Sequence, residues 1–270
     1  MSKRGLTPCI QGGDNRPVSQ RVAITAAAGG FGRTVARAFA ADGADVYVCD
    51  VDAAAVESAA ADGLNASVVD VADGAALERW VDAVLAAGGG LDVLVNNAGI
   101  AGPTALVEDI APGEWERSLA VSLTSHYRTC ARVVPAMKAA GSGSIINISS
   151  TAGQHGIGLR APYVAAKWAV IGLTKTLAIE LGPHGVRANA ICPGSVDGDR
   201  MRGVIAREAD ARDAAAAEVE REYLEGQSIA RFVQPAEIAD LCLFLASDAA
   251  RMISGQAIAV DGHTETFHIG

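Results

Sequence analysis

Residues 21–33 read Arg-Val-Ala-Ile-Thr-Ala-Ala-Ala-Gly-Gly-Phe-Gly-Arg, and alanine-rich sequence follows them. The apolar start predicts a buried β-strand, the glycines a tight turn, and the alanines an α-helix. Glycines let the backbone approach a pyrophosphate closely, and a helix N-terminus can hold it with unpaired N–H groups and a positive dipole end. Glycine-rich turns join many strands to helices, so a dinucleotide site is predicted only if other features agree.

Six more apolar runs follow the first, separated by stretches of helical length and composition. The seven predicted strands are 21–25, 45–49, 66–69, 91–95, 143–148, 186–191 and 257–260. Uniformly apolar strands are typical of parallel sheets covered by helices. The predicted fold is therefore α/β, a doubly wound (Rossmann) seven-stranded parallel sheet with helices on both faces.

The expected organisation is an N-terminal tail at 1–19 and a single dinucleotide-binding and catalytic domain at 20–270. The charged, alanine-rich stretch at about 197–227 breaks the strand and helix rhythm, and such folds usually build a substrate lid at this point. The alternative for this stretch is a solvated helix.

Bulk properties exclude several classes of function. The net charge of −9 argues against a nucleic-acid partner, because phosphate binding needs concentrated Lys and Arg. No apolar run approaches the roughly 20 residues that a membrane-spanning helix needs, and the first residues lack the apolar block of a secretory signal. The five cysteines are scattered, and neither they nor the histidines have metal-ligand spacing. We expect a soluble, cytoplasmic protein with no metal and no membrane partner.

Asp50 ends the second predicted strand, about 20 residues after the glycine turn. An acidic side chain at this place can accept hydrogen bonds from both hydroxyls of an adenosine ribose, and it would repel the 2′-phosphate of NADP. No Arg or Lys lies next to it in sequence. The sequence therefore favours NAD over NADP, with the alternative that Asp50 only opens the following turn together with Asp52.

Tyr163 and Lys167 are spaced i, i+4 in a predicted helix and therefore share a face. A free phenol titrates near 10, but a neighbouring ammonium and a positively charged nicotinamide ring would stabilise its phenolate. Tyr163 could then take or give an alcohol proton while a hydride moves. A surface helix with an exposed Tyr and Lys is the alternative explanation of this spacing.

The order of motifs resembles the short-chain dehydrogenase/reductase family over roughly residues 21–262. After the glycine turn come Asp70-Val71, Asn96-Asn97-Ala98-Gly99, Ile148-Ser149-Ser150, Tyr163 with Lys167, and Pro193-Gly194. The resemblance implies an NAD(P)-dependent alcohol dehydrogenase or ketone reductase. It also implies that Ser150, rather than Ser149, hydrogen-bonds the substrate oxygen, and that Lys167 holds the nicotinamide ribose.

The same resemblance implies a set of cofactor contacts spread along the chain. They are Ala28, Gly30, Phe31, Gly32, Asp50, Asp70, Val71, Asn97, Ala98, Gly99, Tyr163, Lys167, Pro193, Gly194 and Val196. Asp70 and Val71 match adenine contacts, and Val196 matches the backbone position that meets the carboxamide. Relatives pair long helices, here around 114–139 and 161–181, so a homotetramer is expected.

Three positions depart from the family pattern. Ala26 stands where the first glycine of the turn is usual, which suggests a backbone angle that needs no positive φ. Ser122 stands at the fourth catalytic position, usually Asn, where its hydroxyl could still anchor the water that links Lys167 to solvent. The Thr that often follows Pro-Gly is replaced around Asp197-Gly198-Asp199, which changes the expected lid geometry.

The substrate pocket is expected between 154–160, the residues after Gly99 and the 200–226 insertion. Arg160 lies three residues before Tyr163, so a small polar, anionic substrate clamped by this guanidinium is one hypothesis. The alternative is an Arg that caps or solvates the loop. Two other functions remain open, reduction of a 3-oxoacyl thioester and a non-catalytic NAD-binding sensor, and Ser122 alone encourages the latter.

Overall fold

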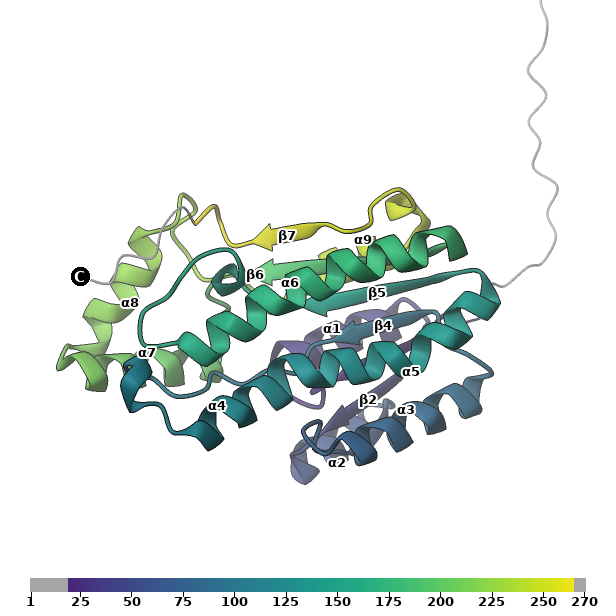
Figure 1. Ribbon diagram of the computed structural model, residues 1–270, viewed down its shortest axis with the longest axis horizontal. Helices are drawn as coiled ribbons and strands as arrows, with labels where there is room; N and C mark the ends of the chain where they lie inside the picture. The colour runs from purple at the N-terminus through teal and green to yellow at the C-terminus, as the bar shows by residue number, and fades with distance from the viewer. Residues whose placement is uncertain (1–18, 265–270) are drawn as a thin grey trace, which may run out of the picture.

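The computed structural model describes residues 19–264 and shows a seven-stranded, wholly parallel sheet (Figure 1). The predicted tail at 1–19 lies almost entirely outside this range. The strands are β1 (Arg21–Thr25), β2 (Asp45–Asp50), β3 (Asn65–Val68), β4 (Val93–Asn96), β5 (Gly143–Ile148), β6 (Val186–Pro193) and β7 (Ala257–Val260). Their order in the sheet is β3-β2-β1-β4-β5-β6-β7, the doubly wound arrangement predicted from the sequence.

The predicted bounds of β1, β5 and β7 are confirmed, and those of the other strands are wrong by one or two residues. Pairing with β3 extends β2 through Asp50, and pairing with β7 extends β6 through Pro193. β4 begins two residues later than predicted. Just before it, the Asp92 carboxylate accepts the backbone N–H of Arg21 at 2.8 Å, while the Asp92 N–H donates to the Arg21 carbonyl at 3.0 Å.

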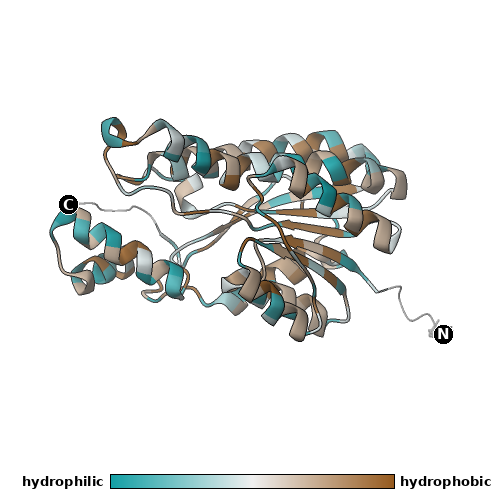
Figure 2. Cartoon of the chain, turned by 90° about the horizontal axis from the view of Figure 1, so that it is seen from below, coloured by the Kyte–Doolittle hydropathy of each residue, from teal (hydrophilic) through white to brown (hydrophobic). Residues whose placement is uncertain are grey.

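Two helical layers enclose the sheet, and each layer has its own apolar core (Figure 2). One layer contains α1 (Gly30–Ala41), α2 (Ala53–Ala61) and α9 (Pro235–Ala246), and the other contains α3 (Gly74–Gly88), α5 (Ser125–Ala140) and α6 (Ala161–Leu181). Val and Ile side chains on both faces of the strands are fully buried against these helices. Burial of both faces explains why the strands read as continuous apolar runs.

α4 (Pro112–Leu119) continues through a π-helical turn, η2 (Ala120–Thr124), into α5. Such a turn widens the helix by one residue and often marks a functional position. Here it contains Ser122, which is fully buried, while the Ser125 hydroxyl donates to the Val121 carbonyl at 2.7 Å. Nothing in the sequence pattern indicated this turn.

The predicted insertion folds into two helices, α7 (Asp199–Arg212) and α8 (Ala216–Glu225), beyond the carboxyl ends of the strands (Figure 1). We call this pair the lid helices. They share a small core of Ile205, Ala209 and Val219, separate from the two main cores. They therefore pack against each other, although Val219 is the only buried residue of α8.

The turn between β1 and α1 corrects one expectation. Ala26 has φ +50°, in the left-handed region, although its methyl group had suggested a backbone without positive φ. Its carbonyl must point at the Asn97 side chain, whose Nδ2 donates to it at 2.7 Å. The left-handed turn is thus retained with alanine, at a conformational cost of roughly 1 kcal/mol.

Within residues 19–264, no helix has the length and apolar character needed to cross a membrane. The same residues contain no cluster of three His, Cys, Asp or Glu side chains that could hold a metal ion.

Candidate active site

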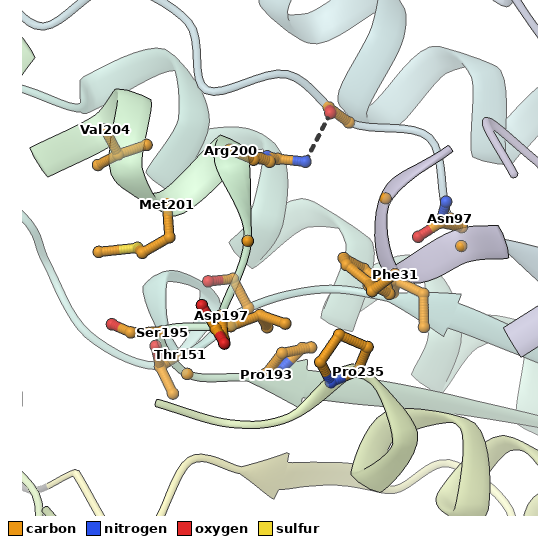
Figure 3. A pocket seen from close by; sticks show the side chains of 18 of the residues that line it. Phe31, Asn97, Thr151, Pro193, Ser195, Asp197, Arg200, Met201, Val204 and Pro235 are labelled. Carbon is orange, nitrogen blue, oxygen red and sulfur yellow. Dashed lines mark hydrogen bonds between the residues drawn. The ribbon is translucent and has the colours of Figure 1, made fainter. Parts of the chain in front are cut away.

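The strand order reverses between β1 and β4, and this reversal opens a crevice at the carboxyl ends of the strands. A cavity of about 620 Å³ occupies this crevice, bounded by the β1–α1 turn, the ends of β5 and β6, and α7 (Figure 3). It brings together Gly30, Phe31, Gly32, Asn97, Gly99, Ser150, Arg160, Tyr163, Lys167, Pro193, Gly194 and Val196 from the predicted set. Residues up to 166 positions apart in sequence therefore share one site.

The start of α1 can accept an anion. No side chain of the described residues caps this helix end, and its first turn carries no acidic residue. A Cβ at Gly32 would lie 2.5 Å from Asn97 Nδ2 and 2.7 Å from the Ala26 carbonyl oxygen, whereas positions 29 and 30 face open space. The backbone is thus packed tightly on one side and open to the cavity on the other, which fits the pyrophosphate of a dinucleotide.

Asp50 ends β2 beside this turn. Its Oδ2 accepts the Ala28 N–H at 3.2 Å, which links the predicted ribose ligand to the predicted cofactor loop. Its Oδ1 accepts the Asp52 N–H at 3.3 Å, so it also supports the following turn as the alternative expected. Asp52 itself caps α2 by accepting from Ala54 and Ala55.

Three of the predicted cofactor contacts, Asp70, Val71 and Ala98, do not line the cavity. Asp70 accepts the Ala72 N–H at 2.9 Å and pairs with Arg117 at 3.1 Å, and this pairing helps to hold the pKa of Asp70 below its ordinary value against the opposing effect of burial. Val71 and Ala98 are buried. Asn97, at the end of β4, ties the loop down because its Nδ2 donates to the carbonyls of both Thr25 and Ala26.

Tyr163 and Lys167 share a face of α6, as their spacing predicted. Lys167 is 2% exposed, and its Nζ donates to the Ile148 carbonyl at 2.7 Å, whereas Tyr163 is half-buried at the cavity wall. The ammonium lies 5.8 Å from the centre of the Tyr163 ring. Both residues therefore belong to the cavity, and the alternative of an exposed surface pair does not describe them.

Arg200, at the start of α7, brings a further positive charge to the site. Its Nη1 donates to the Gly99 carbonyl at 2.9 Å (Figure 3). A Cβ at Gly99 would lie 3.1 Å from Lys167 Nζ. The Gly99 backbone therefore contacts both the Arg200 guanidinium and the Lys167 ammonium. The hydrogen bond from Arg200 thereby joins α7 to the loop after β4, at the residue that lies next to Lys167.

These charges determine how the phenol ionises. Burial alone would raise the pKa of Tyr163, but Arg200, Lys167, the hydrogen bond from Ser150 and Arg160 together hold that pKa below its ordinary value. Burial also lowers the pKa of Lys167, to about 8, which leaves the ammonium mostly protonated at neutral pH. The arrangement can support a phenolate beside an ammonium, as acid and base chemistry on an alcohol requires.

Arg160 is only 7% exposed and lies over the Tyr163 ring, with its guanidinium carbon 5.1 Å from the ring centre. Its Nη2 donates to the Ala101 carbonyl at 3.1 Å, and its Nε has no hydrogen-bond partner among the described residues. It stands at the N-cap of α6 without making a side-chain capping bond. Its bond to Ala101 ties down the loop after β4, as the loop-capping alternative expects, while its burial does not fit a solvated side chain.

Three neighbouring polar residues have structural partners. Ser122 Oγ accepts the Ile100 N–H at 3.2 Å, and the Ser149 hydroxyl donates to the Lys167 carbonyl at 2.8 Å. The Nε2–H of fully buried His126 donates to the Ala98 carbonyl at 2.9 Å, and burial followed by the charge of Lys167 lowers its pKa to about 3. His126 is therefore neutral and positions the strand end beneath the cofactor site.

Sequence reasoning singled out none of the residues that line the cavity from the lid helices, among them Arg200 and Tyr223. The Tyr223 hydroxyl donates to Glu208 Oε2 at 2.6 Å, and Glu208 also pairs with Arg212. The insertion was expected to line the pocket, but the chain offers no local pattern that selects these members. A positive charge in the predicted lid insertion is a signal that could have indicated Arg200.

Comparison with known proteins extends over most of the chain. The family described as "Enoyl-(Acyl carrier protein) reductase" matches residues 26–263. The chain is 42% identical to trans-4-hydroxycyclohexanecarboxylate dehydrogenase of Sinomonas cyclohexanicum, over 91% of this chain and 93% of that protein. It is 38% identical to 2-keto-3-deoxy-L-fuconate dehydrogenase of Xanthomonas campestris, over 96% and 84% respectively.

Among solved structures, NAD⁺-bound xylitol dehydrogenase superposes with a TM-score of 0.86 at 28% identity, covering 90% of this chain and 98% of that one. The shared architecture is the doubly wound sheet described above. Together, the family match and the relatives show an oxidoreductase fold and sequence along the described chain. The chain belongs to the short-chain dehydrogenase/reductase family of NAD(P)-binding oxidoreductases.

Proposed function

We propose that this protein is an NAD-dependent dehydrogenase or ketone reductase for small hydroxy or oxo carboxylates. The observation that carries the proposal is the meeting of Tyr163, Lys167, Arg160 and Arg200 in one cavity, where three positive charges surround a phenol. This local charge contrasts with the net charge of −9 of the whole chain. A built positive site in an acidic protein favours an anionic ligand.

In the proposed reaction, the Tyr163 phenolate accepts the hydroxyl proton of the substrate, and the carbon–hydrogen bond gives up a hydride. When bound, NAD supplies the hydride acceptor, and NADH the donor in the reverse direction. Ser150 orients the substrate oxygen by a hydrogen bond, while Lys167 keeps the phenol acidic and holds the nicotinamide ribose. In reduction, the Tyr163 phenol returns the proton to the carbonyl oxygen. Ser122 anchors the loop after β4 behind Lys167 through Ile100.

The cofactor is proposed to lie along the β1–α1 turn. Ala28, Gly30, Phe31 and Gly32 would contact its pyrophosphate, Asp70 and Val71 its adenine, and Pro193, Gly194 and Val196 its carboxamide end. Asp50 favours NAD, because its carboxylate suits two ribose hydroxyls and repels a 2′-phosphate.

The proposed substrate class rests on Arg160 and Arg200. Arg160 presents an N–H without a partner, and Arg200 projects over the cavity from the lid helices. Both relatives described above are named for substrates with a carboxylate group, a hydroxycyclohexanecarboxylate and a fuconate. A guanidinium recognises a carboxylate through paired N–H donors.

We further propose a homotetramer and a single catalytic domain at 20–270, with the lid at about 197–227. Trp168 and Ile179 support the tetramer, because both are large, exposed and eleven residues apart on one face of α6.

A substrate panel followed by NADH absorbance tests the function. It pairs hydroxy acids with their neutral amides and includes simple polyols and a 3-oxoacyl thioester. We expect a hydroxy acid to exceed its amide by at least about tenfold in kcat/KM, and Arg160→Ala to reduce kcat/KM far more for the acid than for the amide, which abolishes that preference. Equal losses for acid and amide would refute the anion site. A preference for the thioester would support the second function, and no turnover with any compound would support the sensor.

A further inference from the structure

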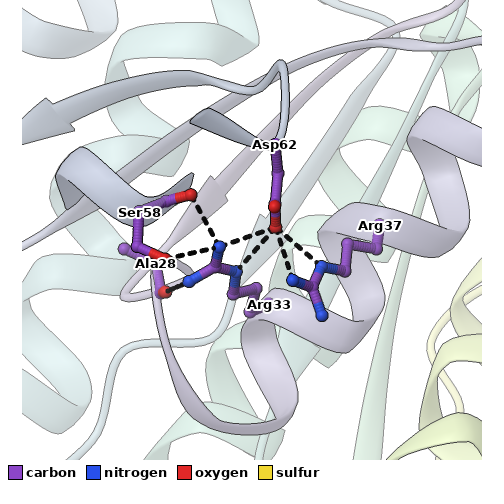
Figure 4. A network of polar contacts seen from close by, with 5 residues as sticks. All are labelled: Ala28, Arg33, Arg37, Ser58 and Asp62. Carbon is purple, nitrogen blue, oxygen red and sulfur yellow. Dashed lines mark hydrogen bonds and ion pairs between the residues drawn. The ribbon is translucent and has the colours of Figure 1, made fainter. Parts of the chain in front are cut away.

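Two arginines of α1 share one carboxylate beside the cofactor turn (Figure 4). Arg33 donates to Asp62 Oδ2 from Nε at 3.1 Å and from Nη2 at 2.6 Å. Arg37, one turn later, donates to the same oxygen from Nε at 2.8 Å and from Nη2 at 2.5 Å. These two guanidinium groups hold the pKa of Asp62 below its ordinary value, so the carboxylate stays ionised at neutral pH.

This cluster adjoins the position assigned to the adenosine ribose. Arg33 Nη1 donates to the Ala28 carbonyl at 3.2 Å, and the backbone N–H of Ala28 donates to Asp50 Oδ2 at 3.2 Å. A guanidinium therefore stands one residue away from the carboxylate that would meet the ribose hydroxyls. In sequence Asp50 has no basic neighbour, but the fold supplies one.

Arg33 is poorly placed to use this position for a phosphate. Its Nη2 also donates to the Ser58 carbonyl at 2.7 Å and to Ser58 Oγ at 3.0 Å, in addition to Asp62. Nη1 donates one of its two N–H groups to Ala28. Its second N–H is therefore the one N–H of the Arg33 guanidinium that has no acceptor among these residues. A guanidinium grips a phosphate with two parallel N–H groups, and Arg33 no longer offers such a pair.

We propose that Asp62 is a specificity-determining residue for the cofactor, because it neutralises and holds Arg33, the cation that would otherwise compensate a 2′-phosphate. In this proposal Asp50 repels the 2′-phosphate, and Asp62 keeps the Arg33 guanidinium from pairing with it. The proposal rests on the NAD preference in the proposed function. It explains how a chain with an arginine in the first turn of α1, beside the cofactor turn, can still discriminate against NADP.

A purely structural role predicts something different. Asp62 follows the end of α2, so its bonds also join α2 to α1, and losing them would lower the melting temperature without changing the ratio of the two cofactor affinities. Asp82 provides a matched control. It forms a similar pair with Arg132 at 2.5 Å, between α3 and α5, in the helical layer opposite α1 and α2.

The test measures Kd for NAD and for NADP by calorimetry on the intact protein, without substrate. The variants are Asp62→Asn, Asp50→Ala, the two combined, the combination with Arg33→Met, and Asp82→Asn. Thermal melts of each variant report folding. We expect Asp62→Asn to improve the NADP to NAD affinity ratio by about threefold in the wild-type background and by at least tenfold in the Asp50→Ala background.

Arg33→Met should remove that gain, and Asp82→Asn should leave the ratio unchanged. The proposal is overturned if Asp62→Asn leaves the ratio unchanged in both backgrounds, if the gain persists without Arg33, or if the wild-type protein binds NADP as tightly as NAD. Because binding is read without turnover, failure of hydride transfer in the substrate panel would be seen separately and would concern the proposed function alone.

Discussion

Arg200 changes the electrostatic account of the acid/base residue. The sequence predicted that Lys167 and a bound nicotinamide ring would activate Tyr163, whereas Arg200 is first among the charged side chains that lower the pKa of this phenol. Lys167 is itself opposed by burial, which lowers its own pKa. A guanidinium keeps its charge at every accessible pH, so it gives the phenolate a partner that does not titrate.

Replacement of Arg200 should therefore move the pH dependence of catalysis. Oxidation needs the phenolate, so its kcat/KM rises with pH up to the pKa of Tyr163. Arg200→Gln removes a positive charge, raises that pKa, and should move the rising limb to higher pH. Arg221→Gln, which alters an exposed pair with Glu225 on α8, is the control. If the rising limb of the pH profile stays at the same pH in Arg200→Gln, Arg200 does not lower the pKa of Tyr163.

Ala26 offers a test of backbone strain at the cofactor turn. Glycine adopts its φ of +50° without a Cβ clash, so Ala26→Gly should raise the free energy of unfolding by up to roughly 1 kcal/mol. The neighbouring Ala27 is fully buried and has no positive φ, and Ala27→Gly should destabilise the protein. Urea denaturation of both variants measures the difference. Destabilisation of equal size at the two positions would show that the turn is not strained.

At the scale of elements, the lid helices are a separately packed unit. Their core of Ile205, Ala209 and Val219 is small, and the polar bonds of Glu208 with Arg212 and Tyr223 hold the two helices together. A unit with so few apolar contacts opens at a lower free energy than the main cores. Substrate entry is expected to use this opening.

Val219→Ala should loosen this unit selectively. The lost methyl groups should lower the local opening free energy of α7 and α8 by about 1–3 kcal/mol, while the melting temperature of the whole protein changes little. Hydrogen exchange followed by mass spectrometry should show faster exchange in 199–225 only. Val35→Ala in the main core should instead lower the melting temperature. Equal loss of protection throughout the chain in Val219→Ala would refute an independent lid.

The elements that the sequence predicted well are those with a local signal. Strands buried on both faces read as apolar runs, and the i, i+4 spacing of Tyr163 and Lys167 follows from helix geometry alone. The features it missed depend on distant partners. Arg200 meets Gly99 across 101 positions, and the left-handed Ala26 is imposed by a bond from Asn97. The π-helical turn around Ser122 also has no compositional mark.

At the scale of the whole molecule, the apolar face of α6 predicts assembly. Light scattering after gel filtration should give the mass of a tetramer, and Ile179→Glu or Trp168→Glu should shift the protein to smaller species by burying a charge in the contact. Val68→Glu, at the exposed outer strand β3, is the control and should leave the mass unchanged. A wild-type monomer at micromolar concentration would contradict the assembly.

The proposed function depends on one proton-transfer group placed beside a dinucleotide. In this proposal the turn before α1 would hold the cofactor, while the ends of β5 and β6 bound the cavity and the first lid helix adds a charge that lowers the pKa of Tyr163. Removal of the Tyr163 hydroxyl deletes the proton acceptor and leaves the ring, so cofactor binding should survive. The loss should therefore appear in turnover and not in affinity for NAD.

The most direct measurement is NADH formation by Tyr163→Phe and wild type with the preferred hydroxy acid of the panel, alongside Kd for NAD by calorimetry. We predict that Tyr163→Phe binds NAD within about twofold of wild type but loses roughly 10²–10⁴-fold in kcat, together with the rising limb of the pH profile. Wild-type turnover by Tyr163→Phe, with the same pH profile, would contradict the account.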